Sequence, residues 1–177
     1  MKRLTLAMAV ASLLLGGCAA SVKQGGSQNL TIPEASKSNL FVSFKGTAEA
    51  ESDTDWNLFK GAWTGALEQE ASAAGYRASE LSSSTNQSAN GVLLVINVNK
   101  FRYLSAGARY AAGVMVGNAW VESEADFIDL HSRQKLGYRT YATSSSAWEG
   151  VVSAMTEKQV QAISKQMIAD IKSAKTQ

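Results

Sequence analysis

The segment from Val92 to Tyr103 is the feature that most limits what this chain can fold into. At its start, apolar side chains occupy both faces of an extended backbone. A strand that is apolar on both faces belongs in the interior of a sheet. We therefore expect a central strand here. One of its faces carries Val92, Leu94, Ile96 and Val98.

Alternation of apolar and other side chains predicts three further strands, at residues 40–45, 119–130 and 135–143. The last two are separated by a short polar turn, so we expect them to form a hairpin. If Leu130 pairs with Lys135, two sets of facing residues result. Phe127 then faces Tyr138 and Ala125 faces Thr140 on the core side, while Asp126 faces Arg139 and Glu124 faces Tyr141 on the solvent side.

Two segments have the spacing of amphipathic helices. Residues 55–74 place large apolar side chains three and four positions apart, and Gly75 follows where a helix commonly ends. A second helix begins near Thr156 and carries a similar apolar stripe. The expected order is strand, helix, three strands, helix. This order predicts a two-layer α+β domain, in which a small antiparallel or mixed sheet packs on two helices.

The N-terminus has the features of a targeting signal. Lys2 and Arg3 precede an uncharged, mostly apolar run of twelve residues, Leu4 to Leu15. A run of this length suits a signal peptide and is too short to cross a bilayer. The run ends in Leu15-Gly16-Gly17-Cys18, which resembles the lipobox of bacterial lipoproteins. The alternative is an incidental cysteine beside an ordinary cleaved signal.

The lipobox resemblance implies how the protein is processed and where it is found. The signal would be cleaved between Gly17 and Cys18, the Cys18 thiol would take a diacylglycerol, and the new amino group would be acylated, for example with palmitate. The protein would then be held to a membrane through this N-terminal lipid. In Gram-negative lipoproteins Asp at the next position commonly means retention in the inner membrane. Ala19 therefore implies the cell outer membrane, with the protein facing the periplasm.

Charge argues against a nucleic-acid partner. Lys2 and Arg3 account for the whole formal net charge of +2, so the processed chain would carry no net side-chain charge.

The domain organisation that we expect has three parts. Residues 1–17 are the lipoprotein signal peptide, residues 18–37 are a flexible tether rich in Ser, Gly, Gln and Ala, and residues 38–177 are a single periplasmic domain. A first strand around Leu30–Ile32 is the alternative for part of the tether.

The C-terminal half resembles a family of small bacterial lipoproteins whose common domain has no assigned function. The matching features begin at Asn90 and include a Gly-spaced run ending at Gly117, and Asp129 before a tight turn. They continue with Lys135-Leu136-Gly137 and a last helix that contains Ala169-Asp170-Ile171. Residues 131–134 replace the Thr-Gly turn that is typical of the family. The element order is also similar to that of periplasmic lipoprotein domains of curli and exopolysaccharide secretion. The resemblance implies no catalytic residue.

The remaining chemical motifs favour neither a metal site, a cofactor nor catalysis. Asp53-x-Asp55-x-Asn57 begins like a calcium loop, but Leu58 stands where the loop needs Gly and Thr64 where it needs Glu. Glu122, Glu124 and Asp126 share one face of a strand. We interpret them as exposed charges that discourage pairing at the edge of a sheet. His131, the single histidine, falls in the predicted turn, where catalytic roles are uncommon. We expect no enzyme.

An apolar, Gly-spaced segment is the best candidate for an interaction surface. It is either a buried strand or turn, or an exposed patch for self-association, for a protein partner or for the membrane surface. The candidate residues are Arg109, Tyr110, Gly113, Val114, Met115, Val116, Gly117 and Trp120. The sequence thus favours a non-enzymatic interaction or assembly module of the cell envelope. A binding module for a small glycan-like ligand and an envelope hydrolase remain the alternatives.

Overall fold

A computed structural model describes residues 20–27, 29–82, 90–105, 118–144 and 156–176. The helices and strands lie in the order β1 (Val22–Gly26), α2 (Glu34–Lys37), β2 (Asn39–Gly46), α3 (Ala48–Ser52), α4 (Trp56–Ala73), β3 (Arg77–Glu80), β4 (Val92–Arg102), β5 (Trp120–Asp129), β6 (Lys135–Ser144) and α6 (Thr156–Ser173). None of the helices in these ranges is both long and apolar enough to cross a membrane. Gly17 and Cys18 lie outside the described residues.

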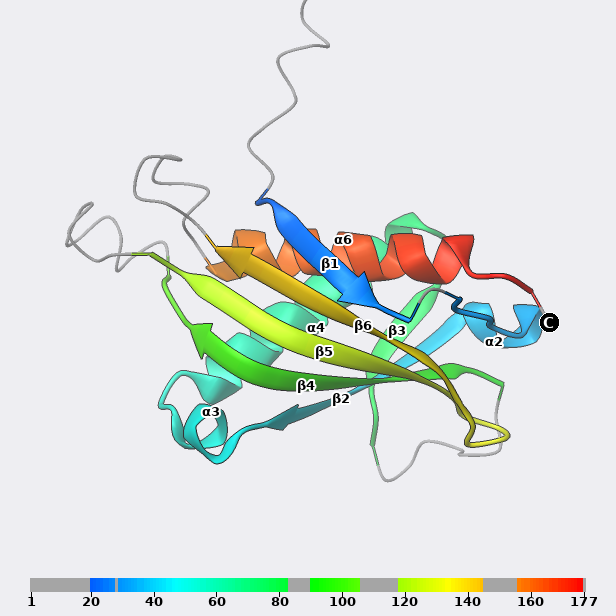
Figure 1. The fold of residues 1–177 in the computed structure, drawn as a ribbon, viewed down its shortest axis with the longest axis horizontal. Coiled ribbons are helices and arrows are strands. Elements are labelled where there is room, and N and C mark those ends of the chain that lie inside the picture. The colour runs from blue at the N-terminus through cyan, green and yellow to red at the C-terminus, as the bar shows by residue number, and fades with distance from the viewer. Residues whose placement is uncertain (1–19, 28, 83–89, 106–117, 145–155, 177) are drawn as a thin grey trace, which may run out of the picture.

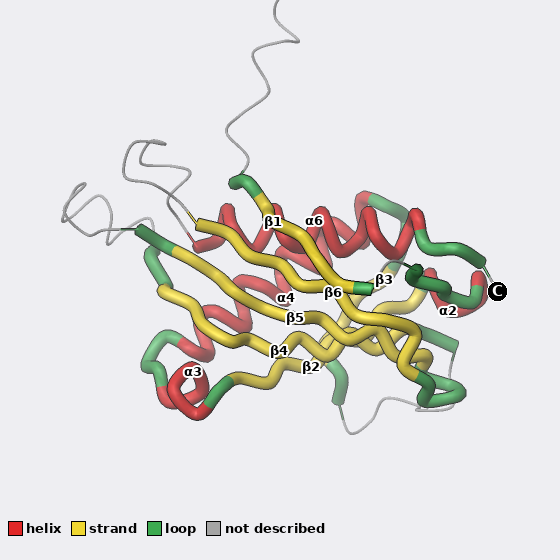
Figure 2. Tube along the Cα trace, viewed as in Figure 1, coloured by secondary structure: helices red, strands yellow, loops and turns green. Residues whose placement is uncertain are grey.

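The strands form one mixed sheet with the order β1-β6-β5-β4-β2-β3. Strand β2 runs parallel to β3 and β4, and the other neighbours pair in antiparallel fashion. Helices α4 and α6 pack against each other and cover one face of the sheet (Figure 1). The described helices leave the other face uncovered (Figure 2), and we call it the open face. The predicted two-layer α+β fold is therefore confirmed, with additional strands at both edges.

The core lies between the sheet and the two helices, where the sequence periodicity predicts it. Strand β4 is central, and its four predicted inward side chains are at most 1% exposed. The predicted apolar stripes of both helices are also buried. They comprise Trp56, Phe59, Trp63, Leu67 and Ala71 of α4, and Val160, Ile163, Met167 and Ile171 of α6. Gly75 ends α4 with φ +80°, a conformation that favours glycine.

The β5–β6 hairpin forms, but the predicted register is wrong by one residue. Asp126 pairs with Tyr138, and Ser123 pairs with Tyr141. Tyr141 is therefore fully buried among the helices, whereas Tyr138 lies on the open face and is 37% exposed. Next to the turn, Ile128 pairs with Lys135, two residues away from the predicted pairing of Leu130 with Lys135. A β-bulge between Phe127 and Ile128 then places one extra residue in one strand and reduces the shift to one residue.

The side chain of Asp129 closes the turn next to this bulge. Its carboxylate accepts hydrogen bonds from the backbone N–H of Ser132 at 2.8 Å and from the Ser132 hydroxyl at 2.6 Å. The Ser36 hydroxyl donates a further bond at 2.9 Å. Burial of the carboxyl opposes its ionisation, but these donors outweigh burial and hold the pKa of Asp129 below its usual value. The turn thus begins inside the predicted strand, which explains the shifted register.

The expected flexible tether over residues 18–37 is wrong for the part that the structure describes. Residues 22–26 form edge strand β1, which pairs with β6 over its whole length. Leu30 and Ile32 are buried, and the backbone of Ile32 bonds to that of Lys175 at the C-terminal end. A strand of this composition is stable because β1 relies on backbone pairing rather than on apolar side chains. Gly26 is required here, since a Cβ atom would lie 2.5 Å from the Tyr138 carbonyl oxygen.

Candidate functional site

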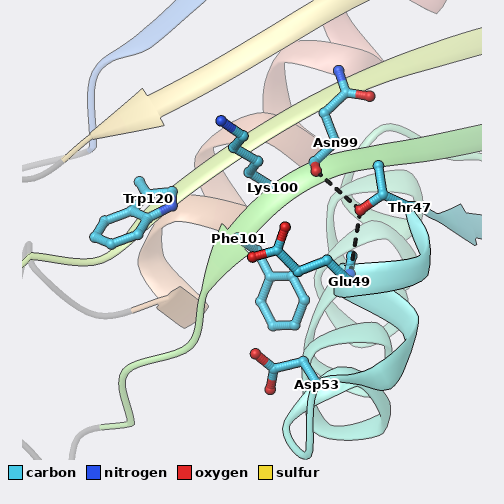
Figure 3. A pocket seen from close by; sticks show the side chains of 8 residues that line it. Thr47, Glu49, Asp53, Asn99, Lys100, Phe101 and Trp120 are labelled. Atoms are coloured by element: carbon cyan, nitrogen blue, oxygen red, sulfur yellow. Dashed lines mark hydrogen bonds between the residues drawn. The ribbon is translucent and has the colours of Figure 1, made fainter.

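A pocket of about 240 Å³ lies between α3 and the neighbouring ends of β4 and β5 (Figure 3). Glu49 and Asp53 come from the α3 side of the pocket, and Lys100, Phe101 and Trp120 come from the two strands. The full lining is Thr47, Glu49, Ala50, Asp53, Asn99, Lys100, Phe101 and Trp120. We call this cavity the α3 pocket.

Thr47 fixes α3 against the sheet. Its hydroxyl accepts the Ala50 N–H at 3.2 Å, which caps the short helix, and donates to the Asn99 carbonyl oxygen at 3.4 Å. Its backbone N–H donates to the carbonyl oxygen of Val98 at 3.2 Å. The pairing of β4 with β5 shifts register between Val98 and Lys100. Such a bulge bends the strand and redirects its side chains, so Asn99 and Lys100 line the pocket.

The pocket combines two carboxylates, an amine and aromatic surface. Glu49 and Lys100 are exposed, and the Asp53 carboxylate accepts the Asp55 N–H at 2.8 Å. Phe101 is mainly a core residue, because its ring stacks on Phe59 with centroids 4.3 Å apart. This arrangement offers hydrogen bonds and a partly apolar surface to a small polar molecule. Across the described ranges, no three His, Cys, Asp or Glu side chains are placed to hold a metal ion.

Trp120 is the one residue of the predicted interaction surface that the structure describes. It begins β5 on the open face and is half-buried. Arg102 of β4 pairs with it across the strands, and the guanidinium lies 5.4 Å from the centre of the indole ring. The other predicted residues of this surface lie outside the described residues. They are Arg109, Tyr110, Gly113, Val114, Met115, Val116 and Gly117.

The acidic and imidazole candidates are all on the surface or in structural contacts. His131 is exposed at the hairpin turn. Asp126 on the open face forms an ion pair with Lys135 at 2.6 Å, which raises the pKa of the lysine. Glu122 is exposed and lies opposite Lys100. Glu122 is thus the exposed strand charge that the sequence predicts, whereas Asp126 is half-buried and paired with Lys135.

Sequence analysis missed a buried polar network around Asp170 of α6. Its carboxylate accepts hydrogen bonds from the Tyr141 hydroxyl at 2.6 Å, from the Gln24 amide at 2.6 Å and from the Gln166 amide at 3.3 Å. Burial, together with the bond to Asp170, raises the pKa of Tyr141 far above its usual value. The network fastens edge strand β1 to the helix layer. Its role is therefore structural, although it borders a second cavity of about 340 Å³ beside Arg139.

Comparison with known proteins finds similar solved structures but no similar sequence. No model of a protein family matches it, and no curated protein matches it. The PelC dodecamer from Paraburkholderia phytofirmans is similar in structure, with 14% identity, a TM-score of 0.50, and coverage of 82% of this chain and 95% of PelC. A DUF330 protein from Xanthomonas campestris has 12% identity and a TM-score of 0.47, over 84% and 90% of the two chains. A protein from Helicobacter pylori, described as a putative neuraminyllactose-binding hemagglutinin homolog, has 12% identity and a TM-score of 0.35, over 82% and 89% of the two chains.

Proposed function

We propose that this protein is a non-enzymatic interaction module of the bacterial cell envelope that associates with further copies of itself. The observation that carries the proposal is the open face of the sheet. This face presents the exposed Tyr138 and the half-buried apolar side chains of Phe41, Leu93 and Ile128. Apolar side chains on an uncovered sheet face are typical of protein interfaces.

The apolar side chains gather at the hairpin end of this face. Leu93 and Ile128 pair across β4 and β5, and they line a groove of about 310 Å³ together with Leu81 and Leu130. The PelC structure that shares this fold is described as a dodecamer. That description supports, for this chain, an assembly of several copies.

The envelope location of the proposal depends on the N-terminal sequence. We propose that the chain is cleaved before Cys18, carries lipid on that cysteine, and is held at the outer membrane facing the periplasm. This part of the proposal rests on the lipobox resemblance of Leu15-Gly16-Gly17-Cys18 together with Ala19.

Self-association is testable by light scattering coupled to size-exclusion chromatography. We expect the chain from Ala19 onward to form an oligomer. Ile128→Lys should shift it toward the monomer, because a charge would be buried in an apolar contact. A loss of about 2 kcal/mol would weaken association by more than tenfold. The matched control is Leu58→Lys, which adds the same charge at a residue 60% exposed on α4 and should leave the oligomer intact. A wild-type chain that stays monomeric at every concentration would contradict self-association.

The α3 pocket favours a second candidate function, the binding of a small glycan-like ligand. Aromatic surface beside carboxylate and amide groups suits sugar rings and their hydroxyls. We expect soluble envelope glycan fragments to change the shift of the Asn99 side-chain amide in an NMR titration, and Glu49→Ala to weaken the effect about tenfold by removing an acceptor. Glu68→Ala on the exposed side of α4 is the control. Unchanged spectra with the wild-type chain would exclude this candidate.

A further inference from the structure

We propose that the end of the sheet carrying Trp120 and Arg102 lies directly on the bilayer surface, with the open face and both helices extending away from it. The occupant of this surface is a membrane that contains anionic phosphate headgroups. The inference rests on the proposed lipid at Cys18. It adds a defined orientation of the domain and a set of membrane-contacting residues.

The strand pairings show where the chain leaves the domain. Val22, the first residue of β1, pairs with Thr143 of β6, which in turn pairs with Val121 of β5. The next row toward this end of the sheet contains Ser144, Trp120 and Arg102. Strand β1 therefore begins at the Trp120 end of the sheet (Figure 1). Trp120 lies two strand spacings from β1, about 10 Å sideways.

The link between this end and Cys18 is short. Three residues lie between Cys18 and Val22 in the sequence, so Val22 is the fourth residue after Cys18, and a fully extended chain of that length spans at most about 14 Å. The expected tether of about twenty residues would span about 70 Å. Since β1 already begins at Val22, a lipid on Cys18 would hold Trp120 within reach of the headgroups. The headgroup layer is itself about 5–8 Å thick on each side of the bilayer.

The side chains at this end suit a membrane interface. Tryptophan is enriched where the bilayer meets water, because its ring is apolar and its N–H can bond to polar groups. The Arg102 guanidinium lies beside the indole, and Lys23 of β1 is exposed on the same face of the sheet. Each basic side chain near an anionic surface contributes about 1 kcal/mol of attraction.

The acidic side chains set the tilt of the domain. Glu49 and Asp53 belong to α3 and its C-terminal end, which follow β2. These carboxylates line the α3 pocket together with Trp120, but they follow β2, which is separated from β1 by β6, β5 and β4 and so lies about 19 Å from β1. Anionic headgroups repel these carboxylates, while the lipid holds the β1 side. The domain should therefore rest on its β1-β6-β5 side, with α3 raised toward the water.

The experiment uses the lipidated full-length protein in vesicles of phosphatidylethanolamine and phosphatidylglycerol. Cys18 is the only cysteine, and lipid attachment would consume its thiol, so an introduced cysteine can carry a single fluorescent label. Ser144→Cys places the label in the Trp120 row, and His131→Cys places it at the opposite end of the sheet. Both positions are exposed. The vesicles carry a nitroxide quencher on their headgroups.

We expect quenching at position 144 to be several-fold stronger than at position 131. Trp120→Ala should reduce it, whereas Tyr138→Ala, which removes another exposed aromatic ring from the same face, should not. Equal quenching at positions 144 and 131, or equal effects of the two alanine variants, would overturn the proposed orientation. Mass spectrometry of the same sample separates the two proposals. Lipid on Cys18 with equal quenching leaves the anchor standing, whereas the absence of lipid removes both the anchor and the orientation.

Discussion

Cys18→Ala is expected to abolish lipid attachment completely. Diacylglycerol would be attached to the Cys18 thiol, and alanine has no group to which it could be attached. If the lipobox interpretation is correct, cleavage before residue 18 depends on that lipid, so the variant should accumulate as a precursor that still carries residues 1–17. Metabolic labelling with radioactive palmitate measures the first effect. The mass of the purified protein measures the second.

A neighbouring substitution provides the control for this experiment. Ala19→Ser changes the adjacent small residue but keeps the thiol, and it should take up label like the wild type. The expected loss in anchoring is large, because each buried methylene contributes about 0.8 kcal/mol and three acyl chains would be lost together. If the wild-type protein itself takes up no palmitate and has an ordinary amino terminus, the lipoprotein interpretation is wrong.

Periodicity predicted the interior of this fold correctly. The inward face of β4 and the buried stripes of α4 and α6 all follow from spacings of two, three and four residues. These spacings depend only on backbone geometry and on the need to bury apolar area, so a single sequence is enough to place them. Exposed Leu58 and buried Phe59 are adjacent in the sequence, and the predicted helix face separates them.

The register of the β5–β6 hairpin and the edge strand β1 could not be predicted in the same way. The hairpin register differs by one residue because Asp129 closes an earlier turn with its own side chain, which moves the pairing by two residues, and the bulge between Phe127 and Ile128 moves it back by one. Likewise, β1 has few apolar side chains, and it joins the sheet through backbone bonds and the contact between Gln24 and Asp170. Both features depend on specific hydrogen bonds between residues distant in sequence or in a turn. Hydropathy patterns do not contain this information.

The candidate site was also predictable from the sequence only in part. The position of Trp120 at the start of a strand was predictable from alternation. The α3 pocket was not, because it depends on the bulge between Val98 and Lys100 and on the bond from Thr47 to the Asn99 carbonyl. Sequence analysis considered Asp53 only as the start of an incomplete calcium loop and assigned no role to Glu49. The tertiary fold instead places them beside an amine and an aromatic ring.

Phe59→Ala is expected to remove a large part of the stability of the domain. Phe59 is fully buried and forms the centre of an aromatic cluster, with Trp63 at 5.4 Å, Trp56 at 6.1 Å and Phe101 at 4.3 Å between ring centroids. Truncating a buried phenylalanine costs about 3–5 kcal/mol, because it loses apolar burial and leaves a cavity. Domains of ordinary stability unfold with about 5–15 kcal/mol, so the variant should be largely destabilised.

Leu58→Ala is the matched control, since it shortens an apolar side chain one position earlier on the same helix. Leu58 is 60% exposed, and its truncation should change the free energy of unfolding by about 0.5 kcal/mol or less. Urea unfolding of the chain from Ala19 onward, followed by tryptophan fluorescence, measures both variants because Trp56 and Trp63 adjoin the site. Similar losses in the two variants would contradict the assignment of the helix face. They would then place the core of the domain elsewhere than between α4, α6 and the sheet.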